Sequence, residues 1–446
     1  MQTDLLGKLV KMGKSVAVIC PDVNDLNISR YCQEKNVALY GFEAKNNFRA
    51  DNHFFARKYF LEDIETNPAL YEKHIWATHF NTSRNLWRRL RPHYYWILYK
   101  ARRKYPLIKE WFKKKEKRYL VSQRAYRLLQ HIHPRKLIST YPVNLNEAVL
   151  LHNAEGMEGV ETWIHLLSWD NITCKGIFPA VATKYIAWGE VMRDELLEYY
   201  HPDPSDIFIC GVPHFDLHYD VSQKGLYRDY VTHLGLFSEK PYMFFAMSAP
   251  RFSPHEIDVV EWIADKVSKG YFGEMQFIVR PHPQNVEGNF ADKSWLPRLH
   301  CLNQLPNVAV DFPRLVKSKI NWSMEMDDMT RMSNLLSGAS VTLNSCSTVS
   351  IESLILKRPV ILTVFDSDRE IPYWRSVRRM KEFPHLRKLI AMGGVSLASN
   401  YNELENLIRL YIDYPNYLLG PRDRTVELEC YRNDGKATER VIEVLA

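Results

Sequence analysis

Short apolar runs alternate with helix-spaced segments along the first half of the chain. Helical spacing is found over Leu5–Met12 and again through Glu147–Ala154. Short buried strands that alternate with helices predict a parallel sheet covered by helices on both faces. The runs that predict such strands are SVAVICP (15–21), KNVALYGF (35–42), RKLISTYP (135–142), TWIHLLSW (162–169), KYIAWGE (184–190) and DIFICGVP (206–213).

A second series of the same kind occupies the rest of the chain. It consists of YMFFAMSAP (242–250), MQFIVRPHP (275–283), NVAVDFP (307–313), ASVTLN (339–344), RPVILTVF (358–365) and GVSLAS (394–399). Between the two series, residues 218–240 are polar and rich in turn formers, and we predict a domain boundary there. The pattern therefore predicts an α/β protein with two Rossmann-like, doubly wound parallel-sheet domains facing a cleft, at 1–225 and 240–446.

The bulk properties narrow the class of protein. The 446 residues suffice for two or three domains, and the hydrophobic content of 46% is typical of a globular chain. No apolar run reaches the roughly 18–20 residues that span a bilayer, and no signal peptide opens the chain, so we expect a cytoplasmic protein. The seven cysteines include no CxxC pair, which predicts neither structural disulfides nor a zinc site.

A serine-rich stretch, NSCSTVSIESLILKRPVI (344–361), follows one predicted strand. We expect the turn at Ser345–Ser347 and a helix over Thr348–Leu356. In open α/β sheets ligands bind outside the carboxyl ends of strands, and a helix N-terminus there attracts phosphate. Ser345, Ser347 and Thr348 would add donors, and Glu352, expected on the helix surface, would accept hydrogen bonds from ribose hydroxyls. The alternative is ordinary helix capping by these Ser, Thr and Glu residues.

Other strand ends of the same predicted domain carry similar groups. Arg280 and His282 lie in RPHP, between prolines that stiffen the loop, and Ser248 and Arg251 follow another strand. Together with the serine-rich turn they predict a nucleotide-diphosphate site. For Asp327 and Asp328, just before a predicted helix, capping is the expected role; Asp366 and Asp368 follow a further strand.

The first domain offers HLLSWDNITCKG after a predicted strand. We take Asp170 as the candidate general base, because it should lie at the cleft-facing end of its strand. The alternative is an Asx-turn, in which the Asp and Asn side chains bind their own backbone. Trp169 is either a stacking platform or core. The accompanying candidates on the acceptor side are His165, Asn171, Thr173 and Lys175.

Together these motifs resemble a bacterial family of GT-B-type glycosyltransferases, near the CDP-glycerol glycerophosphotransferase-like and the capsule or lipopolysaccharide sugar transferases. The matching pieces, from about Thr140 to the C-terminus, are SWDNITCKG, GVPHFD (211–216), SAPRFSPHE (248–256), RPHP, NSCSTVSIES and SVRRMKEFPHL (376–386). The resemblance implies a GT-B-like fold whose C-terminal domain holds a nucleotide-linked donor and whose N-terminal domain holds the acceptor.

On that resemblance Arg280, His282, Ser347, Thr348 and Glu352 line the donor site, and Arg, His and a helix dipole stabilise the leaving diphosphate. His282 and Asp170 are the catalytic candidates. We find no metal-binding DxD motif and expect no obligatory metal or other cofactor. Because members of the family begin with a strand, we also expect that the first strand is missing here or that the true start lies upstream.

The segment 81–120 is strongly basic. It holds fourteen Lys and Arg residues and two Glu, a net charge of +12, which leaves −5 for the remainder of a chain whose total is +7. Within it, residues 87–119 interleave these cations with Trp, Tyr and Phe. Such a helical insertion favours an anionic membrane surface, and hence a peripheral position on the inner face of the cytoplasmic membrane. Single-stranded nucleic acid, which we do not expect as a partner, and an ordinary solvated helix pair are the alternatives.

The sequence therefore predicts a glycosyltransferase that moves a sugar from a nucleotide-activated donor to a lipid-linked glycan of a cell-surface polysaccharide. Inverting and retaining mechanisms both stay open. Three alternatives remain: a polyol-phosphate transferase that uses a CDP-alditol, a UDP-sugar epimerase-like enzyme, and a nucleotide-binding scaffold without turnover.

Overall fold

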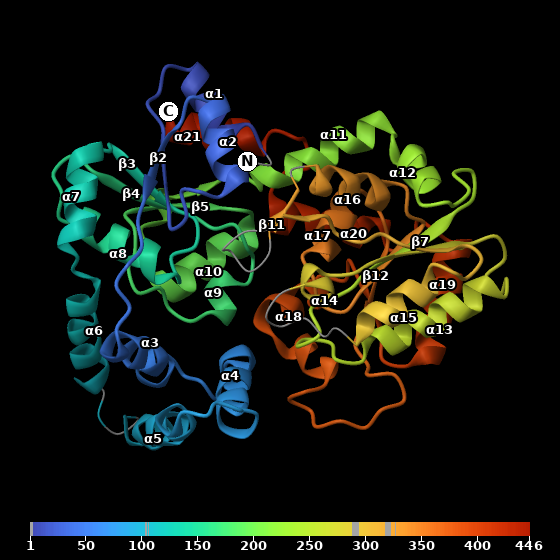
Figure 1. Cartoon of the computed structure of the whole chain (residues 1–446), viewed down its shortest axis with the longest axis horizontal. Coiled ribbons are helices and arrows are strands. Elements are labelled where there is room, and N and C mark those ends of the chain that lie inside the picture. The colour runs from blue at the N-terminus through green and yellow to red at the C-terminus, as the bar shows by residue number, and fades with distance from the viewer. Residues whose placement is uncertain (1–2, 103–104, 106, 288–293, 317–322, 326) are drawn as a thin grey trace.

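The computed structural model describes residues 3–102, 105, 107–287, 294–316, 323–325 and 327–446 (Figure 1). Two parallel sheets dominate it. The N-terminal sheet has the order β3-β4-β5-β6, and the C-terminal sheet has the order β14-β13-β12-β7-β8-β9. The predicted α/β class with two parallel-sheet domains is thus confirmed, while the boundaries at 225 and 240 stay predictions.

The strands lie close to the predicted apolar runs. The N-terminal sheet consists of β3 (Lys136–Ser139), β4 (Glu161–His165), β5 (Lys184–Ala187) and β6 (Ile207–Ile209). The C-terminal sheet consists of β7 (Tyr242–Ala246), β8 (Gln276–Arg280), β9 (Val308–Val310), β12 (Val341–Asn344), β13 (Val360–Thr363) and β14 (Ser396–Ala398). Two further pairs are the parallel β1 (Ala17–Cys20) and β2 (Ala38–Gly41) and the antiparallel β10 (Leu315–Val316) and β11 (Ser323–Met324).

Helices cover the N-terminal strands and extend from them. They are α1 (Leu5–Lys11), α2 (Leu26–Glu34), α7 (Gln123–Ile132), α8 (Leu145–Ala154), α9 (Asn171–Cys174), α10 (Glu190–Tyr200), η1 (Pro204–Asp206) and η2 (Pro213–Phe215). Between β2 and β3 the chain inserts a helical unit, residues 48–120, with α3 (Phe48–Leu61), α4 (Pro68–His79), α5 (Leu86–Arg102) and α6 (Leu107–Leu120). In Figure 1 this unit lies below the sheet, and α4 is on its side toward the C-terminal domain.

The segment that we predicted as turn-rich forms two helices, so that part of the prediction is wrong. They are α11 (Asp216–Lys224) and α12 (Tyr227–His233), and both pack against α16. Their polar faces are exposed, which hides the helical pattern. The other helices of this half are α13 (Glu256–Ser268), α14 (Pro283–Val286), α15 (Trp295–Leu302), α16 (Asp328–Ser337), α17 (Val349–Ile355), η3 (Val377–Glu382), α18 (Pro384–Ala391) and α19 (Tyr401–Asp413).

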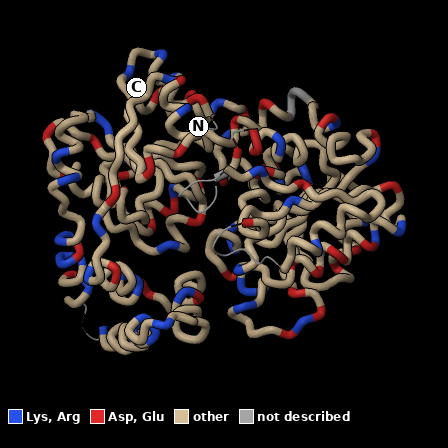
Figure 2. The backbone as a smooth tube through the Cα atoms, viewed as in Figure 1, with Lys and Arg blue, Asp and Glu red and all other residues tan. Residues whose placement is uncertain are grey.

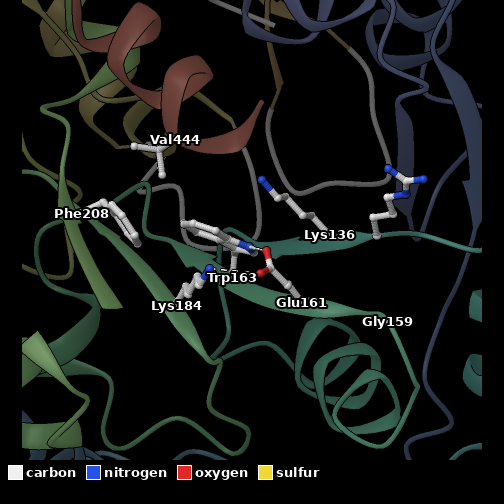
Figure 3. A pocket seen from close by; sticks show the side chains of 8 residues that line it. Lys136, Gly159, Glu161, Trp163, Lys184, Phe208 and Val444 are labelled. Carbon is white, nitrogen blue, oxygen red and sulfur yellow. Dashed lines mark hydrogen bonds and ion pairs between the residues drawn. The ribbon is translucent and has the colours of Figure 1, made fainter. Parts of the chain in front are cut away.

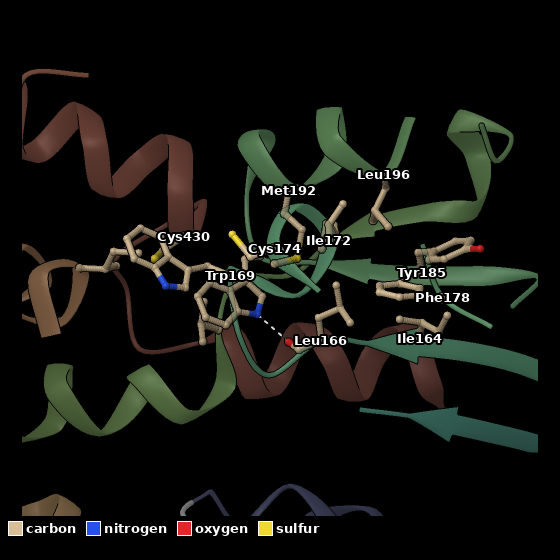
Figure 4. Close-up of a cluster of buried hydrophobic side chains, with 14 of the residues drawn as sticks. Ile164, Leu166, Trp169, Ile172, Cys174, Phe178, Tyr185, Met192, Leu196 and Cys430 are labelled. Carbon is tan, nitrogen blue, oxygen red and sulfur yellow. Dashed lines mark hydrogen bonds between the residues drawn. The ribbon is translucent and has the colours of Figure 1, made fainter. Parts of the chain in front are cut away.

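The last two helices return to the N-terminal sheet. Helix α20 (Leu419–Cys430) packs on both α10 and α17, and α21 (Ala437–Leu445) lies beside α1 (Figure 1). Gly189 permits the close approach, because a Cβ there would lie 2.3 Å from the carbonyl oxygen of Leu428. One hydrophobic core accordingly runs from α9 and α10 to Cys430 of α20 (Figure 4). This shared core fixes the two sheets relative to each other.

Candidate functional site

Asp170 follows β4 and begins α9. Its Oδ2 lies 2.8 Å from Nζ of Lys175, and its Oδ1 accepts a hydrogen bond of 2.6 Å from the Ser168 hydroxyl. Burial opposes ionisation of Asp170, but Lys175 and Ser168 outweigh it and hold the pKa of this carboxyl below its usual value. Its side chain makes no capping hydrogen bond to the α9 backbone, so the Asx-turn alternative is not what the structure shows. Asp170 is therefore an ionised carboxylate at neutral pH.

Two neighbours of Asp170 have unused hydrogen-bonding capacity. Nε2 of His165 and both Oδ1 and Nδ2 of Asn171 are buried without a hydrogen-bond partner among the described residues. Burial, reinforced by His214, lowers the pKa of His165 to about 4, so its ring is neutral. Buried polar atoms without a hydrogen-bond partner are rare in folded proteins, and a bound ligand is one explanation for them. Trp169, by contrast, packs in the core.

The other domain meets this edge through α18. Nδ1 of His385 lies 3.1 Å from the Cys174 thiol, and its ring makes an edge contact with Trp169. Burial lowers the pKa of His385 to about 4, although Asp170 partly opposes that shift. The carboxyl edge of the N-terminal sheet thus lies directly at the domain interface.

In the C-terminal domain, the loops after β7 and β12 are joined by a buried carboxylate that the sequence analysis did not select. Glu256 accepts a hydrogen bond of 2.6 Å from the backbone N–H of Ser248 and another from the hydroxyl of Ser345. Burial raises the pKa of Glu256 to about 7, and the two serines partly offset this. Cys346 lies beside them, its Sγ 3.7 Å from the Ser248 hydroxyl. Glu256 ends the quoted motif SAPRFSPHE, the one signal that pointed to it.

The serine-rich turn has the predicted local structure. Thr348 is the N-cap residue of α17 but makes no side-chain capping bond, whereas the hydroxyl of Ser347 accepts from the N–H of Val349 at 3.3 Å. Ser347 and Thr348 are half-buried. Capping by Ser347 is thus real, and Thr348 keeps a hydroxyl that the helix does not use.

Glu352 is not on the helix surface, and that expectation is wrong. It is buried, and its Oε2 lies 3.1 Å from Nε2 of His218, whose Nδ1 is 2.8 Å from the Ser333 hydroxyl. Helix α11 covers this face of α17, which explains the burial. Any contact between Glu352 and a ribose would therefore compete with His218.

Arg280 at the end of β8 is also buried. Its guanidinium pairs with Asp311 (Nη1 to Oδ2, 2.5 Å) and with Asp328. The expected capping role of the Asp327–Asp328 pair is wrong: Asp327 occupies the N-cap position without a side-chain capping bond, and Asp328 instead neutralises Arg280. Arg280 thus holds β8, β9 and α16 together and presents little free charge to a phosphate.

His282 caps α14, since its Nδ1 accepts the backbone N–H of Gln284 at 3.0 Å. Burial lowers its pKa to about 4, so the imidazole is neutral at pH 7. With Nδ1 as acceptor, the proton is on Nε2. His282 is therefore a neutral hydrogen-bonding group, not the positive charge expected for a phosphate contact.

Arg251 follows β7 and is exposed. Its guanidinium lies over the ring of Trp76 of α4, and its Nη2 is 3.9 Å from Glu72 of the same helix. Of the candidate donor residues in this domain, Ser248 and Ser345 are thus linked through Glu256. Arg280 lies in buried ion pairs with Asp311 and Asp328, Glu352 lies against the buried His218, and Arg251 faces the helical unit.

A cavity of about 460 Å³ lies at the opposite edge of the N-terminal sheet (Figure 3). Lys136, Glu161 and Lys184 are the first residues of β3, β4 and β5, so this is the amino edge of the strands. Its polar groups pair with one another: Lys184 Nζ is 3.1 Å from Glu161, which also accepts from the indole N–H of Trp163. None of the predicted site residues lines it.

The basic helices α5 and α6 each have an inner and an outer face. Tyr99 and Phe112 pack in the core of the helical unit, which rules them out as membrane contacts. The outward face of α5 carries Leu86, Leu90, Tyr94 and Ile97. Figure 2 shows Lys and Arg residues repeated along both helices. Arg103 and Lys104 lie outside the described residues.

The described part of the chain lacks both a membrane-spanning helix and a metal-binding cluster of side chains. No helix there is long and apolar enough to cross a bilayer. No three His, Cys, Asp or Glu side chains are grouped there in a way that would hold a metal ion.

No protein-family model and no curated protein sequence matches the chain. Solved structures do match it. The wall teichoic acid polymerase TagF has a TM-score of 0.39 and 16% identity, over 59% of this chain and 57% of that one, so the chain spans little more than half of that polymerase. UDP-GlcNAc 2-epimerase from Neisseria meningitidis, bound to UDP-GlcNAc, has a TM-score of 0.47 and 13% identity, over 74% and 80% of the two chains.

A further UDP-N-acetylglucosamine 2-epimerase matches with a TM-score of 0.48 and 12% identity, over 97% of this chain and 95% of that one. These proteins are enzymes with the GT-B arrangement of two parallel-sheet domains. At such identities the likeness concerns architecture, and we assign no residue a role from it.

Proposed function

We propose that this protein is a glycosyltransferase that moves a sugar from a nucleotide-activated donor to a growing, lipid-linked cell-surface polysaccharide such as a capsule or O-antigen. The observation that carries the proposal is the set of orphaned polar atoms at the carboxyl edges of both sheets. They belong to His165 at the end of β4 and Asn171 after it, to Asn344 at the end of β12 and to Asn285 after β8. Ligands of open α/β sheets bind at such edges.

In this proposal the roles divide between the two domains. Ser248, Arg251, Ser345, Ser347 and Thr348 bind the donor nucleotide, with Arg280 supporting them from its ion pairs and Glu352 from its contact with His218. His282 donates Nε2–H to the leaving phosphate oxygen. On the acceptor side, Asp170 takes the proton of the attacking hydroxyl in an inverting reaction, and His165, Asn171 and Lys175 hold the acceptor. No metal and no other cofactor takes part.

A lipid-linked acceptor would lie in the membrane, and the basic helices α5 and α6 offer a surface that could bind there. The outward face of α5, with its Leu, Ile and Tyr side chains amid Arg residues, fits the headgroup layer of an anionic membrane, as does Trp111 of α6. We propose that this face holds the enzyme peripherally on the cytoplasmic side of the membrane.

A thermal-shift screen against UDP, GDP, CDP, CMP, ADP and dTDP, with and without magnesium, tests the donor half of the proposal. A ligand that binds the native state raises its melting temperature. A selective shift with UDP, GDP or dTDP supports sugar transfer and names the donor to assay. A selective shift with CDP or CMP favours alditol-phosphate or acidic-sugar transfer. Turnover of the nucleotide sugar without acceptor would mean epimerisation, and no shift at all would contradict the donor site.

Asn171→Leu provides a matched test of the orphaned atoms. The two side chains are similar in size, and the substitution removes two buried polar groups that have no partner in the free protein. We expect the melting temperature to stay or rise while turnover with the identified donor falls. A melting temperature that falls, with activity intact, would mean that Asn171 serves the fold.

A further inference from the structure

Arg379 of η3 is fully buried although it carries a charge. Nη1 donates to the carbonyl oxygens of Ser376 at 2.6 Å and Phe252 at 3.1 Å. Nη2 donates to the carbonyl oxygen of Arg251 at 3.1 Å and lies 3.4 Å from Oε1 of Glu72. One guanidinium thus joins η3, the loop after β7 and a helix 307 positions away in sequence.

Glu72 is the carboxylate in this arrangement and is itself only 2% exposed. A buried guanidinium is costly unless a carboxylate neutralises it, and removal of one partner leaves the other as an uncompensated buried charge. The pair therefore exists only while α4 of the helical unit is docked against the C-terminal domain. If α4 moved away, Arg379 would lose its counter-charge.

A hydrogen bond and a ring contact also hold α4 against the C-terminal domain. The indole N–H of Trp76 donates to the carbonyl oxygen of Trp374 at 3.2 Å, and the ring of Tyr71 makes an edge contact with the Trp374 ring at 5.2 Å. These contacts lie on either side of Glu72 along the helix. They mark α4 as the docking surface of the helical unit on the C-terminal domain.

The backbone that Arg379 holds belongs to the candidate donor loop, residues 248–252. The loop begins at Ser248, whose N–H is bound by Glu256, and its other end is fixed at the Arg251 and Phe252 carbonyls. Glu256 reaches Ser345 of the neighbouring strand end as well. The donor loop is therefore anchored at one end within its own domain and at the other by a guanidinium whose counter-charge comes from the helical unit.

We propose that Glu72, acting through Arg379, positions loop 248–252, so that docking of the helical unit and nucleotide binding are coupled. The coupling rests on the donor site proposed above; the positioning of the loop does not. Coupling of this kind is reciprocal: nucleotide binding stabilises the docked helical unit to the extent that docking favours nucleotide binding. Glu72 is a positioning residue and does not itself touch the donor.

Glu72→Gln tests the proposal, since it keeps the shape of the side chain and removes the charge. We expect amide hydrogen exchange at 249–252 and 376–380 to become at least several-fold faster in the ligand-free protein, with β7 and β12 unchanged. We also expect about a tenfold weaker affinity for whichever of UDP and CDP binds the wild type. Glu72→Asp, which restores the charge, should recover part of both effects.

Glu65→Gln is the control, because Glu65 is a carboxylate of the same helical unit whose ion pair with Lys100 is on the surface. It should change neither readout. Unchanged exchange at 249–252 in Glu72→Gln would overturn the proposal, and faster exchange with unchanged affinity would overturn the coupling. Should neither nucleotide bind the wild type, the donor site fails while exchange still decides whether Glu72 positions the loop. If Glu72→Gln does not fold, Trp76→Phe replaces it with the same outcomes, since it removes the bond to Trp374 and keeps an aromatic ring beneath Arg251.

Discussion

His218 and Glu352 form a buried pair, with Nε2 of the histidine 3.1 Å from the carboxylate, between two helices that are far apart in sequence. Glu352→Ala should therefore lower the free energy of unfolding by about 1–3 kcal/mol, because it removes the carboxylate beside a buried ring nitrogen that has no hydrogen-bond partner among the described residues. Urea unfolding monitored by circular dichroism measures this. A double-mutant cycle with His218→Phe should show that the two losses are not additive.

The opposite result would restore the surface position that the sequence suggested. If Glu352→Ala is as stable as the wild type while nucleotide affinity falls, the carboxylate is available to a ligand and its contact with His218 contributes little. Glu439→Ala, which removes a carboxylate from the exposed first turn of α21, would calibrate the loss of an ordinary helix-end charge.

His282→Asn separates the two roles of that residue. Asparagine is a good helix N-cap, so it should replace Nδ1 as acceptor for the Gln284 N–H and keep the melting temperature within a few degrees. It cannot reproduce the Nε2–H donor, and turnover should drop by about 10²-fold, the effect of one lost donor to a developing charge. Normal turnover with a normal melting temperature would show that His282 is only a cap.

Asp170→Asn should lower turnover by about 10²–10⁴-fold and leave nucleotide affinity unchanged, because the amide cannot accept the acceptor's proton. The matched control is Glu161→Gln. Glu161 is also paired with a lysine, Lys184 at 3.1 Å, but at the opposite edge of the same sheet. Initial rates and nucleotide titrations on both variants decide the matter. Equal losses in the two would point to a general effect of charge removal on the N-terminal domain.

The strand ends could be predicted from the sequence, whereas the pairing of the side chains on them could not. Buried strands show as apolar runs, and the residue after each run must lie at the carboxyl edge, which placed Asp170, Arg280 and Ser345 correctly along the chain. Arg280, however, finds Asp311 and Asp328, and local sequence has no signal for partners 31 and 48 positions away. The two helices at 216–233 were not predicted for another reason, which is that they are short and expose polar faces.

Burial also changed the chemistry expected of several residues. An Arg-Pro-His-Pro turn predicts cations, yet the histidine is neutral and the arginine is neutralised by carboxylates. For Glu256 the structure adds a role. In the sequence it is an ordinary glutamate at the start of a helix, whereas in the structure its buried carboxylate links two donor loops. Desolvation, which depends on the whole fold, decides both cases.

Stability should depend on pH and fall steeply as the pH drops from 6.5 to 4. Histidines with a folded pKa of about 4 are neutral when folded and take up a proton on unfolding below their unfolded pKa of about 6.5. Each therefore costs up to about 1.4 kcal/mol of stability per pH unit as the pH falls from 6.5 to 4. These histidines are His74, His165, His214, His282 and His385.

Two buried carboxyls act in the other direction. Burial raises the pKa of Glu256 to about 7 and that of Glu429, which also faces Glu195, to about 8. They hold a proton when folded and lose it on unfolding above pH 4.5, so their contribution to stability falls as the pH rises toward their folded pKa. Above pH 7 this loss is offset by Lys58 and Lys73, because burial lowers their pKa to about 7 and about 8 and they take up a proton on unfolding. Melting temperatures from pH 4 to 9 measure the profile, and Glu429→Gln should gain melting temperature relative to the wild type as the pH rises from 4.5 to 8. The same change with pH in both proteins would contradict the assignment of Glu429.

Membrane attachment should depend on the exposed apolar side chains of helices α5 and α6. Leu107 is 81% and Trp111 57% exposed, one turn apart on α6, with Nζ of Lys115 over the Trp111 ring. The wild type should bind vesicles that contain phosphatidylglycerol and be released by salt, because exposed Lys and Arg contribute about 1 kcal/mol each near an anionic surface. Leu107→Ser combined with Trp111→Ser should weaken binding by tenfold or more.

The matched control for this experiment is Phe237→Ser, which removes a side chain that is equally exposed but lies in the C-terminal half of the chain. Its vesicle affinity should equal that of the wild type in a flotation assay. A single-stranded RNA competitor should not displace the wild type from the vesicles. Displacement by RNA would favour nucleic acid as the partner of the basic face. Equal binding to neutral and anionic vesicles would mean nonspecific apolar contact, because the basic face would then not recognise lipid charge.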